Sequence, residues 1–227
     1  MLDEPLRPHG IDHRTSPSLA AAKVGSYSYS AAGKRLLDLL LVLLVGPFFL
    51  PIIAILAILV RLDGGPAFYL QPRVGRGGNT FMLWKLRTMV PNAEAALEGY
   101  IAGNAAARSE WNATQKLRHD PRLTAIGPYL RRYSLDELPQ LWNVLIGDMS
   151  LVGPRPMLTS QRPLYPGTAY YDLRPGLTGL WQISERNNCT FAERATYDSR
   201  YATSLTIFTD MGILLRTVGV VFRGTGC

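Results

Sequence analysis

The sequence has little cysteine, little histidine and few charged residues. Among 227 residues there are two cysteines and three histidines, and Cys189 and Cys227 lie far apart without a second Cys or His at metal-ligand spacing. This argues against a disulfide framework and against a zinc site. Charged residues make up only 18% of the chain and apolar residues 47%, a balance that is compatible with partial burial in lipid.

Two common signatures for binding phosphate or nucleic acid are also missing. Three glycines occur between residues 75 and 78, but no Gly-Lys-Ser/Thr follows them and the context is strand-turn-strand, so a nucleotide P-loop is rejected. The formal charge of +7 favours anionic partners. Because the basic residues form no run interleaved with aromatic residues, nucleic acid is not an expected partner.

The chain divides into a leader, an apolar segment and a polar body. Residues 1–33 mix Pro, Ser, Ala, Gly and Tyr without apolar periodicity, which predicts a flexible leader. Residues 34–61 contain one long apolar run, and residues 62–227 form the body. The length favours one domain with elaborations.

The apolar run from Leu36 to Val60 is long enough to cross a bilayer, which takes roughly 20 residues. Gly46, Pro47 and Pro51 interrupt its middle, and prolines bend helices sharply. Basic residues flank both ends, and such residues prefer the cytoplasmic side. We therefore expect a re-entrant helical hairpin broken at Gly46-Pro47, with a plain spanning helix as the alternative because spanning helices also tolerate proline.

Asp38 is the one acid near the start of this run. A charge there costs free energy unless it is paired, and Lys34 and Arg35 lie four and three residues upstream on the same helical face. We expect an ion pair between Asp38 and one of them at the membrane interface.

The body predicts an α/β (α+β) fold, rich in helix and with a small β-hairpin. The expected elements are a hairpin formed by two strand-like runs around the glycine-rich turn, a helix at 91–117 interrupted at Gly99 and Gly103, a short strand at 177–183 that carries Trp181, and two helical runs after residue 190.

Two adjacent acids, Asp136 and Glu137, are the leading candidates for chemistry. Ser134 with Glu137 three residues later is a capping box, a pattern that usually only starts a helix. Pro139 favours a different start, because proline prefers the first helical position. A helix beginning near Pro139 would place both acids just before its first turn, where a phosphate is also favoured.

Several arginines surround these acids in the sequence. Arg131 precedes them, Arg155 is held between two prolines, and Arg174 lies beside a Pro-Gly turn. A guanidinium binds phosphate through two parallel hydrogen bonds. Each arginine alone is more often a surface ion pair, and their recurrence around one acid pair favours phosphate chemistry.

The sequence resembles the bacterial sugar transferases, the monotopic phosphoglycosyl transferases that begin exopolysaccharide and glycoconjugate assembly. The resemblance runs from Lys34 to the C-terminal end. Its motifs are KRLLD at 34–38, the Gly46-Pro47 break, KLRTM at 85–89, SLDELPQLWN at 134–143, GDMSLVGPRP at 147–156 and RPGLTGLWQI at 174–183. One departure is Glu185-Arg186-Asn187, where many members read Gly-Arg-Asn.

The resemblance implies a re-entrant membrane helix and a cytoplasmic catalytic domain with interfacial helices at 62–227. It implies transfer of a hexose-1-phosphate, with galactose or glucose expected, from a UDP-sugar to undecaprenyl phosphate with Mg²⁺. Asp136 would be the nucleophile, and Asp136 and Glu137 would hold the metal. The residues expected to contact phosphate are Arg131, Arg155, Arg174, Lys85 and Arg87.

The resemblance also implies a location at the cytoplasmic face of the bacterial inner membrane. The oligomeric state stays open, with a homodimer among the alternatives. Two other functions remain as rivals: a UDP-sugar hydrolase or phosphatase that uses the same aspartate, and a non-catalytic membrane assembly factor.

Overall fold

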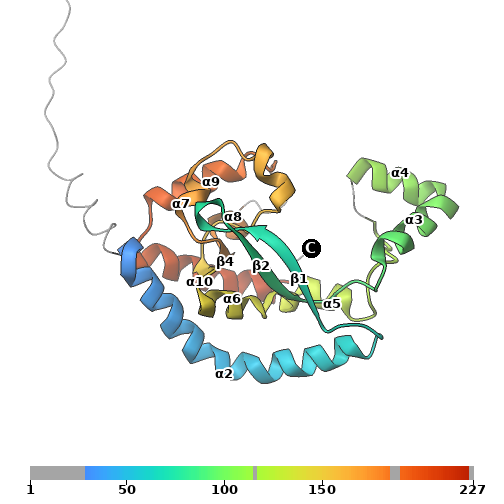
Figure 1. Cartoon of the computed structure of the whole chain (residues 1–227), viewed down its shortest axis with the longest axis horizontal. Helices are drawn as coiled ribbons and strands as arrows, with labels where there is room; N and C mark the ends of the chain where they lie inside the picture. Colours follow the sequence, from blue (N-terminus) through green and yellow to red (C-terminus); the bar gives the residue numbers. More distant parts are fainter. Residues whose placement is uncertain (1–28, 115–116, 185–189, 225–227) are drawn as a thin grey trace, which may run out of the picture.

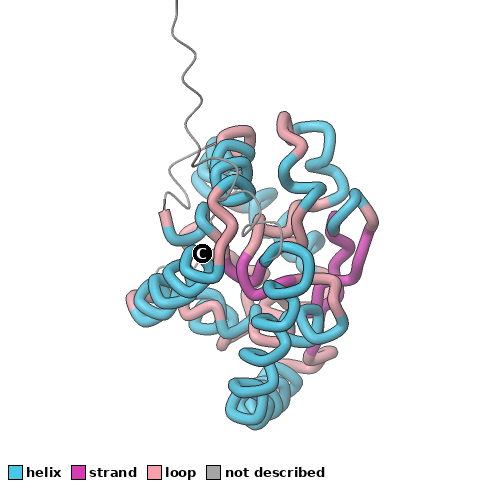
Figure 2. The backbone as a smooth tube through the Cα atoms, turned by 90° about the vertical axis from the view of Figure 1, so that its left-hand side faces the viewer, coloured by secondary structure: helices cyan, strands magenta, loops and turns pink. Residues whose placement is uncertain are grey.

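The computed structural model describes residues 29–114, 117–184 and 190–224. Most of the expected leader, the histidines within it, both cysteines and the Glu185-Arg186-Asn187 departure lie outside these residues. Helices dominate, and the strands form two small pairs (Figure 1, Figure 2). The expected helix-rich fold with a small hairpin is confirmed in this respect.

The elements follow one another in a simple order. A short π-helix, η1 (Tyr29–Gly33), leads into α2 (Lys34–Arg61). The remaining helices and 3-10 turns are η2 (Arg76–Gly78), α3 (Ala93–Gly103), α4 (Ala105–Thr114), α5 (Gly127–Arg132), η3 (Leu135–Glu137), α6 (Gln140–Ile146), η4 (Thr159–Leu164), α7 (Ala169–Asp172), α8 (Leu180–Ile183), α9 (Arg194–Thr203) and α10 (Ile207–Phe222). The strands are β1 (Phe68–Val74), β2 (Thr80–Leu86), β3 (Ser150–Val152) and β4 (Gly176–Thr178).

The apolar run forms one continuous helix, α2, with Pro47 and Pro51 inside it. Its direction changes along its length (Figure 1), as the prolines predict. It is a bent helix rather than two arms joined by a turn. By length and composition it is the one described helix that could cross a membrane.

The expected hairpin is confirmed: β1 and β2 pair antiparallel, with Val74 opposite Thr80 beside the glycine-rich turn. The second sheet joins β3 and β4 in parallel. Beside this strand pair the two backbone segments lie very close together. A Cβ on Gly153 would lie 2.3 Å from the carbonyl oxygen of Arg174, so glycine is required there.

Two local predictions are wrong. Gly99 lies inside α3 without interrupting it, although Gly103 is the last residue of α3 and the predicted break follows directly at Asn104. The predicted strand at 177–183 ends at Thr178, and Trp181 lies on the short helix α8. The two helical runs of the tail are confirmed as α9 and α10.

The main hydrophobic core lies where α6 packs between α2 and β2. Its buried residues come from helices and strands that are far apart in the sequence. They are Val42, Leu83, Leu141, Val144, Met149, Leu151, Val152, Tyr201, Leu205 and Ile213. In contrast, α3 and α4 pack against each other and lie to one side of this core (Figure 1). The core thus fixes α6 and the turn that precedes it.

Candidate active site

Asp136 and Glu137 lie in the 3-10 turn η3, directly before α6. Ser134 adopts a left-handed conformation with φ of 56° and makes no capping hydrogen bond, so the capping box is wrong. Pro139 is the residue that precedes the first helical position. The interpretation in which the helix begins near Pro139 is confirmed.

Asn143 joins α6 to the hairpin. This residue is fully buried; its Oδ1 accepts from the Trp84 amide at 3.0 Å, and its Nδ2 donates to the Met82 carbonyl at 2.8 Å. These bonds use the open edge of β2. They hold the strand beside η3, so that Lys85, the next residue along β2, reaches the two acids.

The acids share their basic neighbours unequally. Lys85 Nζ lies 2.8 Å from Oε1 of Glu137 and 3.7 Å from Oδ2 of Asp136. Arg155 Nη2 also donates to Oε1 of Glu137, at 3.2 Å. Glu137 is therefore engaged by two cations, whereas the nearest cation to the buried Asp136 is at longer range.

This arrangement drives the two pKa values apart. Burial raises the pKa of the Asp136 carboxyl, and the charge of Glu137 raises it further, against the attraction of Lys85. Burial would also raise the pKa of Glu137, but Lys85 and Arg155 outweigh it and hold that pKa at about 2. Pairs of carboxyl groups separated in this way often have different roles in an active site.

Arg131 and Arg73 add further positive charge. Arg131 donates to Thr88 Oγ1 at 2.9 Å and lowers the pKa of Asp136 through its charge. Burial, followed by repulsion from Arg155, lowers the pKa of Arg73 to about 10. Unlike Arg131, Arg73 was not expected at the site from the sequence.

Arg73, Lys85, Glu137 and Arg155 line one shallow hollow, which is open to solvent. Three cations against one carboxylate make this a site for an anion. Arg73 and Lys85 meet there because the hairpin register places residues 73 and 85 on the same face of β1 and β2. Predicting Arg73 as a site residue would have required this strand register.

Two expected phosphate ligands are not brought to the acids. Arg87 is buried and donates to the backbone carbonyls of Val60, Pro66 and Met89. Arg174 donates to the carbonyl of Gly147 at the C-terminal end of α6. Both guanidinium groups hold backbone segments together, which residue type and neighbouring turns did not reveal.

Arg155 also lines a second shallow hollow. Aromatic side chains line it, among them Tyr165 and Trp181, together with the buried carboxyl of Asp198. Burial raises the pKa of Asp198 to about 6. No sequence motif indicated this hollow, since its residues come from several separate segments between Arg155 and Asp198.

The two acids of η3 are suited to a magnesium ion but do not make a complete cage. Within the described ranges no group of three or more His, Cys, Asp or Glu side chains gathers at one point. Mg²⁺ is commonly held by one or two carboxylates, with substrate phosphates and water completing its shell. Asp136 and Glu137 are two carboxylates of this kind, and one oxygen of Glu137 is engaged by Lys85 and Arg155.

Comparison with known proteins identifies the family. The family described as bacterial sugar transferase matches residues 29–224, and the chain belongs to it. It is 44% identical over 195 residues to a UDP-galactose-lipid carrier transferase of Erwinia amylovora and to an undecaprenyl-phosphate galactose phosphotransferase of Salmonella typhimurium. Each match covers 85% of this chain and 41% of the relative, so the chain spans less than half of their length.

Shorter relatives match along most of their length. The exopolysaccharide production protein ExoY of Sinorhizobium fredii is 42% identical over 196 residues, which cover 85% of this chain and 87% of ExoY. A UDP-glucose:undecaprenyl-phosphate glucose-1-phosphate transferase of Caulobacter vibrioides is 35% identical over 227 residues, covering 94% and 79% of the two chains. The resemblance drawn from the motifs is confirmed.

Proposed function

We propose that this protein transfers hexose-1-phosphate, with galactose or glucose as the sugar, from a UDP-sugar to undecaprenyl phosphate, as a step that begins exopolysaccharide synthesis. The names of three relatives support this substrate pair, and the name of ExoY supports exopolysaccharide synthesis. The observation that carries the proposal is the separation of the two acids. Glu137 is neutralised by two cations, while its buried neighbour Asp136 is available as a nucleophile.

The reaction proceeds in two displacements, which divides one difficult transfer into two easier steps. An Asp136 oxygen attacks the phosphorus that carries the sugar, and the bond from this phosphorus to the bridging oxygen breaks. UMP leaves with that bonding pair. A phosphate oxygen of the lipid then attacks the same phosphorus, and the bond to Asp136 breaks, which regenerates the carboxylate.

The cations make the first attack feasible because a carboxylate and a pyrophosphate repel each other. Arg73, Lys85 and Arg155 line the hollow beside the acids and neutralise charge on the phosphoryl oxygens. Glu137 stays ionised at neutral pH because its pKa is about 2, so it orients Lys85 and Arg155 rather than moving a proton. A magnesium ion held by Asp136 and Glu137 would supply further positive charge to the phosphates.

The packing of α2 supports a re-entrant arrangement at the cytoplasmic face of the bacterial inner membrane. Lys34 at one end forms an ion pair with Asp210 at 2.6 Å, and Val60 at the other end accepts a hydrogen bond from Arg87. The middle exposes large apolar side chains such as Phe48, which is 73% exposed. Because both ends pack against the same polar body, both ends belong on the same side of a membrane.

Measurement of UMP release tests the function. With UDP-galactose or UDP-glucose and Mg²⁺, the protein is expected to release about one UMP per active site without acceptor and to turn over only when undecaprenyl phosphate is added. Asp136→Asn is expected to lose at least about a thousandfold in rate, whereas Asp172→Asn, which alters an exposed acid outside the acid pair, should retain it.

The same assay separates the rival functions. Sustained UMP release without acceptor would identify a hydrolase. No release with any UDP-sugar, together with an unchanged phenotype for Asp136→Asn at normal expression, would identify a non-catalytic assembly factor.

A further inference from the structure

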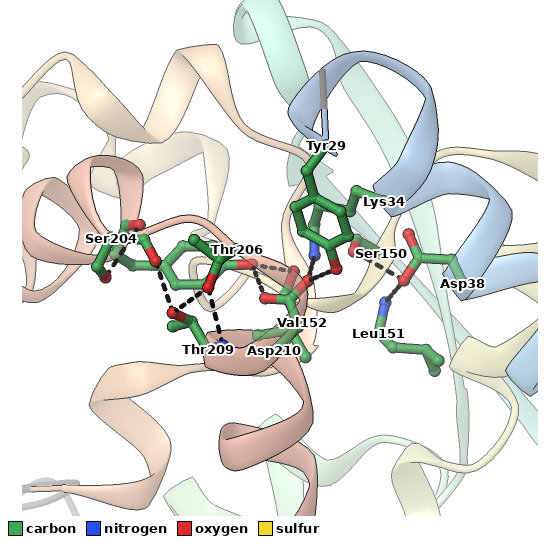
Figure 3. A network of polar contacts seen from close by, with 11 residues as sticks. Tyr29, Lys34, Asp38, Ser150, Leu151, Val152, Ser204, Thr206, Thr209 and Asp210 are labelled. Carbon is green, nitrogen blue, oxygen red and sulfur yellow. Dashed lines mark hydrogen bonds and ion pairs between the residues drawn. The ribbon is translucent and has the colours of Figure 1, made fainter. Parts of the chain in front are cut away.

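Two charged residues of the first turns of α2 are buried inside the protein rather than at a lipid surface. Lys34 and Asp38 lie four residues apart on one helical face and are 8% and 2% exposed. The expected ion pair between Asp38 and Lys34 or Arg35 is wrong. Lys34 pairs with Asp210 of α10 at 2.6 Å (Figure 3). Arg35 donates to backbone carbonyls of α6.

Asp38 binds the strand β3 instead. Its Oδ1 accepts from Ser150 Oγ at 3.0 Å and from the Leu151 amide at 2.9 Å (Figure 3). Asp38 lies 112 residues from Ser150 and 113 residues from Leu151 in the sequence. The membrane helix therefore contacts the polar body through a specific pair of hydrogen bonds and not only through apolar packing.

Val152, the next residue of the same strand, is connected to Asp210 of α10 through Tyr201. Tyr201 Oη donates to Asp210 Oδ1 at 2.6 Å and lies 3.3 Å from the carbonyl oxygen of Val152. Asp210 also accepts from Lys34 of α2. All three residues of β3 are thus connected, directly or through Tyr201 and Asp210, to one face of α2.

A short and stiff connection links β3 to the candidate active site. The Gly153 amide donates to the backbone carbonyl of Thr178 at 2.8 Å. The Gly176 amide donates to the backbone carbonyl of Pro154, also at 2.8 Å. Arg155 follows at once, between two prolines, and donates to Glu137. A shift of β3 would therefore move Arg155 relative to the acids, because little free backbone lies between them.

Stability alone does not account for this choice of residues. A buried carboxylate is costly to desolvate, and apolar side chains of similar volume often stabilise such a contact as well or better. Asp38 Oδ2 is buried and, among the described residues, has no hydrogen-bond partner. What the carboxylate adds is direction, since its two hydrogen bonds fix where β3 lies along α2.

We propose that Asp38 is a positioning residue for sugar-phosphate transfer: through β3 it sets the place of Arg155 beside Glu137, so that the membrane helix is part of the framework of the active site. This inference rests on the proposed function. Asp38 touches neither substrate nor the reacting acids, and its effect passes through Ser150 and Leu151.

The test uses the full chain in lipid nanodiscs and measures the rate of the first step as UMP release from a UDP-sugar without acceptor. Asp38→Ala removes the acceptor and is expected to slow this step about tenfold or more, as small misplacements of catalytic groups do. Asp38→Asn retains an acceptor oxygen and should restore most of the rate. Asp63→Ala, which removes an exposed acid at the other end of the helix, is the matched control.

A double-mutant cycle separates positioning from a merely structural role. If Asp38 acts through Arg155, Asp38→Ala should cost less than about twofold once Arg155 is already alanine, because the two effects are coupled. Equal fold losses in both backgrounds would overturn the proposal. If Asp38→Ala does not fold, Ser150→Ala, which removes one of the two donors, takes its place with a smaller loss of the same kind.

The outcomes also distinguish this inference from the proposed function. No UMP release by the wild-type protein would remove the proposed function itself. Normal release by the wild type and an undiminished rate in both Asp38→Ala and Ser150→Ala would remove only the positioning role.

Discussion

Arg155 Nη2 donates to Oε1 of Glu137 at 3.2 Å, and this contact joins the Gly-Pro-Arg-Pro turn to the 3-10 turn that carries the acids. Lys85 donates to the same oxygen. Glu137 thus gathers two cations from segments that are distant in sequence and holds them beside Asp136. The candidate site is organised around Glu137, which stays unmodified in the proposed reaction.

Altering the two neighbours of Asp136 should shift its titration in opposite directions. Burial and the charge of Glu137 raise the pKa of Asp136, and Lys85 lowers it. The acid limb of the pH profile for UMP release should therefore lie above the ordinary value of 3.8. Glu137→Gln should move this limb to lower pH, and Lys85→Met should move it to higher pH.

The control for these profiles is Glu98→Gln, which alters an exposed acid of α3. Shifts of the same sign in Glu137→Gln and Lys85→Met would contradict the assignment of the limb to Asp136. Both variants should also release UMP more slowly than the wild type, since each disrupts the arrangement of cations.

Arg155 and Arg87 should respond differently to replacement by lysine. Arg155→Lys loses the planar fork at the anion site and should slow UMP release by about tenfold or more with little change in Tm. Arg87 donates to three backbone carbonyls, so Arg87→Lys should destabilise the protein by about 1–3 kcal/mol. The folded fraction of Arg87→Lys should keep its rate; a selective loss of rate would place Arg87 at the site after all.

Asn143→Ala should be among the more destabilising single changes. It removes the acceptor for the Trp84 amide and the donor to the Met82 carbonyl at a fully buried position. Buried groups left without partners cost about 1–3 kcal/mol each. Denaturant unfolding measures the loss, and a change below about 0.5 kcal/mol would show that the junction between α6 and β2 contributes little.

Asp198 should make stability depend on pH. Its folded pKa is raised to about 6 by burial, against an ordinary value of 3.8. The folded protein therefore binds this proton more tightly than the unfolded chain does, and the contribution of Asp198 to stability is lost as pH rises from about 4 to 6. Asp198→Asn, which retains an acceptor for Tyr165, should raise the free energy of unfolding at pH 8 by on the order of 1 kcal/mol.

The gain from Asp198→Asn should shrink at pH 5, where the wild-type carboxyl is largely protonated. Thermal unfolding at the two pH values measures this difference, with Asp172→Asn as an exposed control. An equal gain at both pH values would rule out titration of Asp198 as its cause.

Local sequence signals predicted the parts of the fold that depend on neighbouring residues. The glycine-rich turn predicted the β1–β2 hairpin, and Pro139 predicted the start of α6 just after the acids. The motifs shared with the family brought Lys85 and Arg155 to attention together with Asp136. The hairpin and the helix start are confirmed because each prediction rests on residues adjacent in the chain, whereas the roles of Lys85, Arg155 and Asp136 stay predictions.

Long-range contacts account for what the sequence did not predict. Arg87 and Arg174 carry the same charge as Arg155, but in the fold their guanidinium groups donate to backbone carbonyls. Lys34 and Asp38 look like an ion pair within one helix, but their partners lie more than 100 residues away. Charge and spacing give no register for such contacts.

In the proposed reaction Asp136 forms a covalent bond to the sugar phosphate. Incubating the protein with its UDP-sugar and Mg²⁺ but no lipid, quenching it, and mapping peptides by mass spectrometry tests this most directly. We expect a hexose-phosphate mass on the peptide that contains Asp136, and this mass should disappear when undecaprenyl phosphate is added. An unmodified Asp136 under conditions in which lipid-linked product forms readily would contradict it.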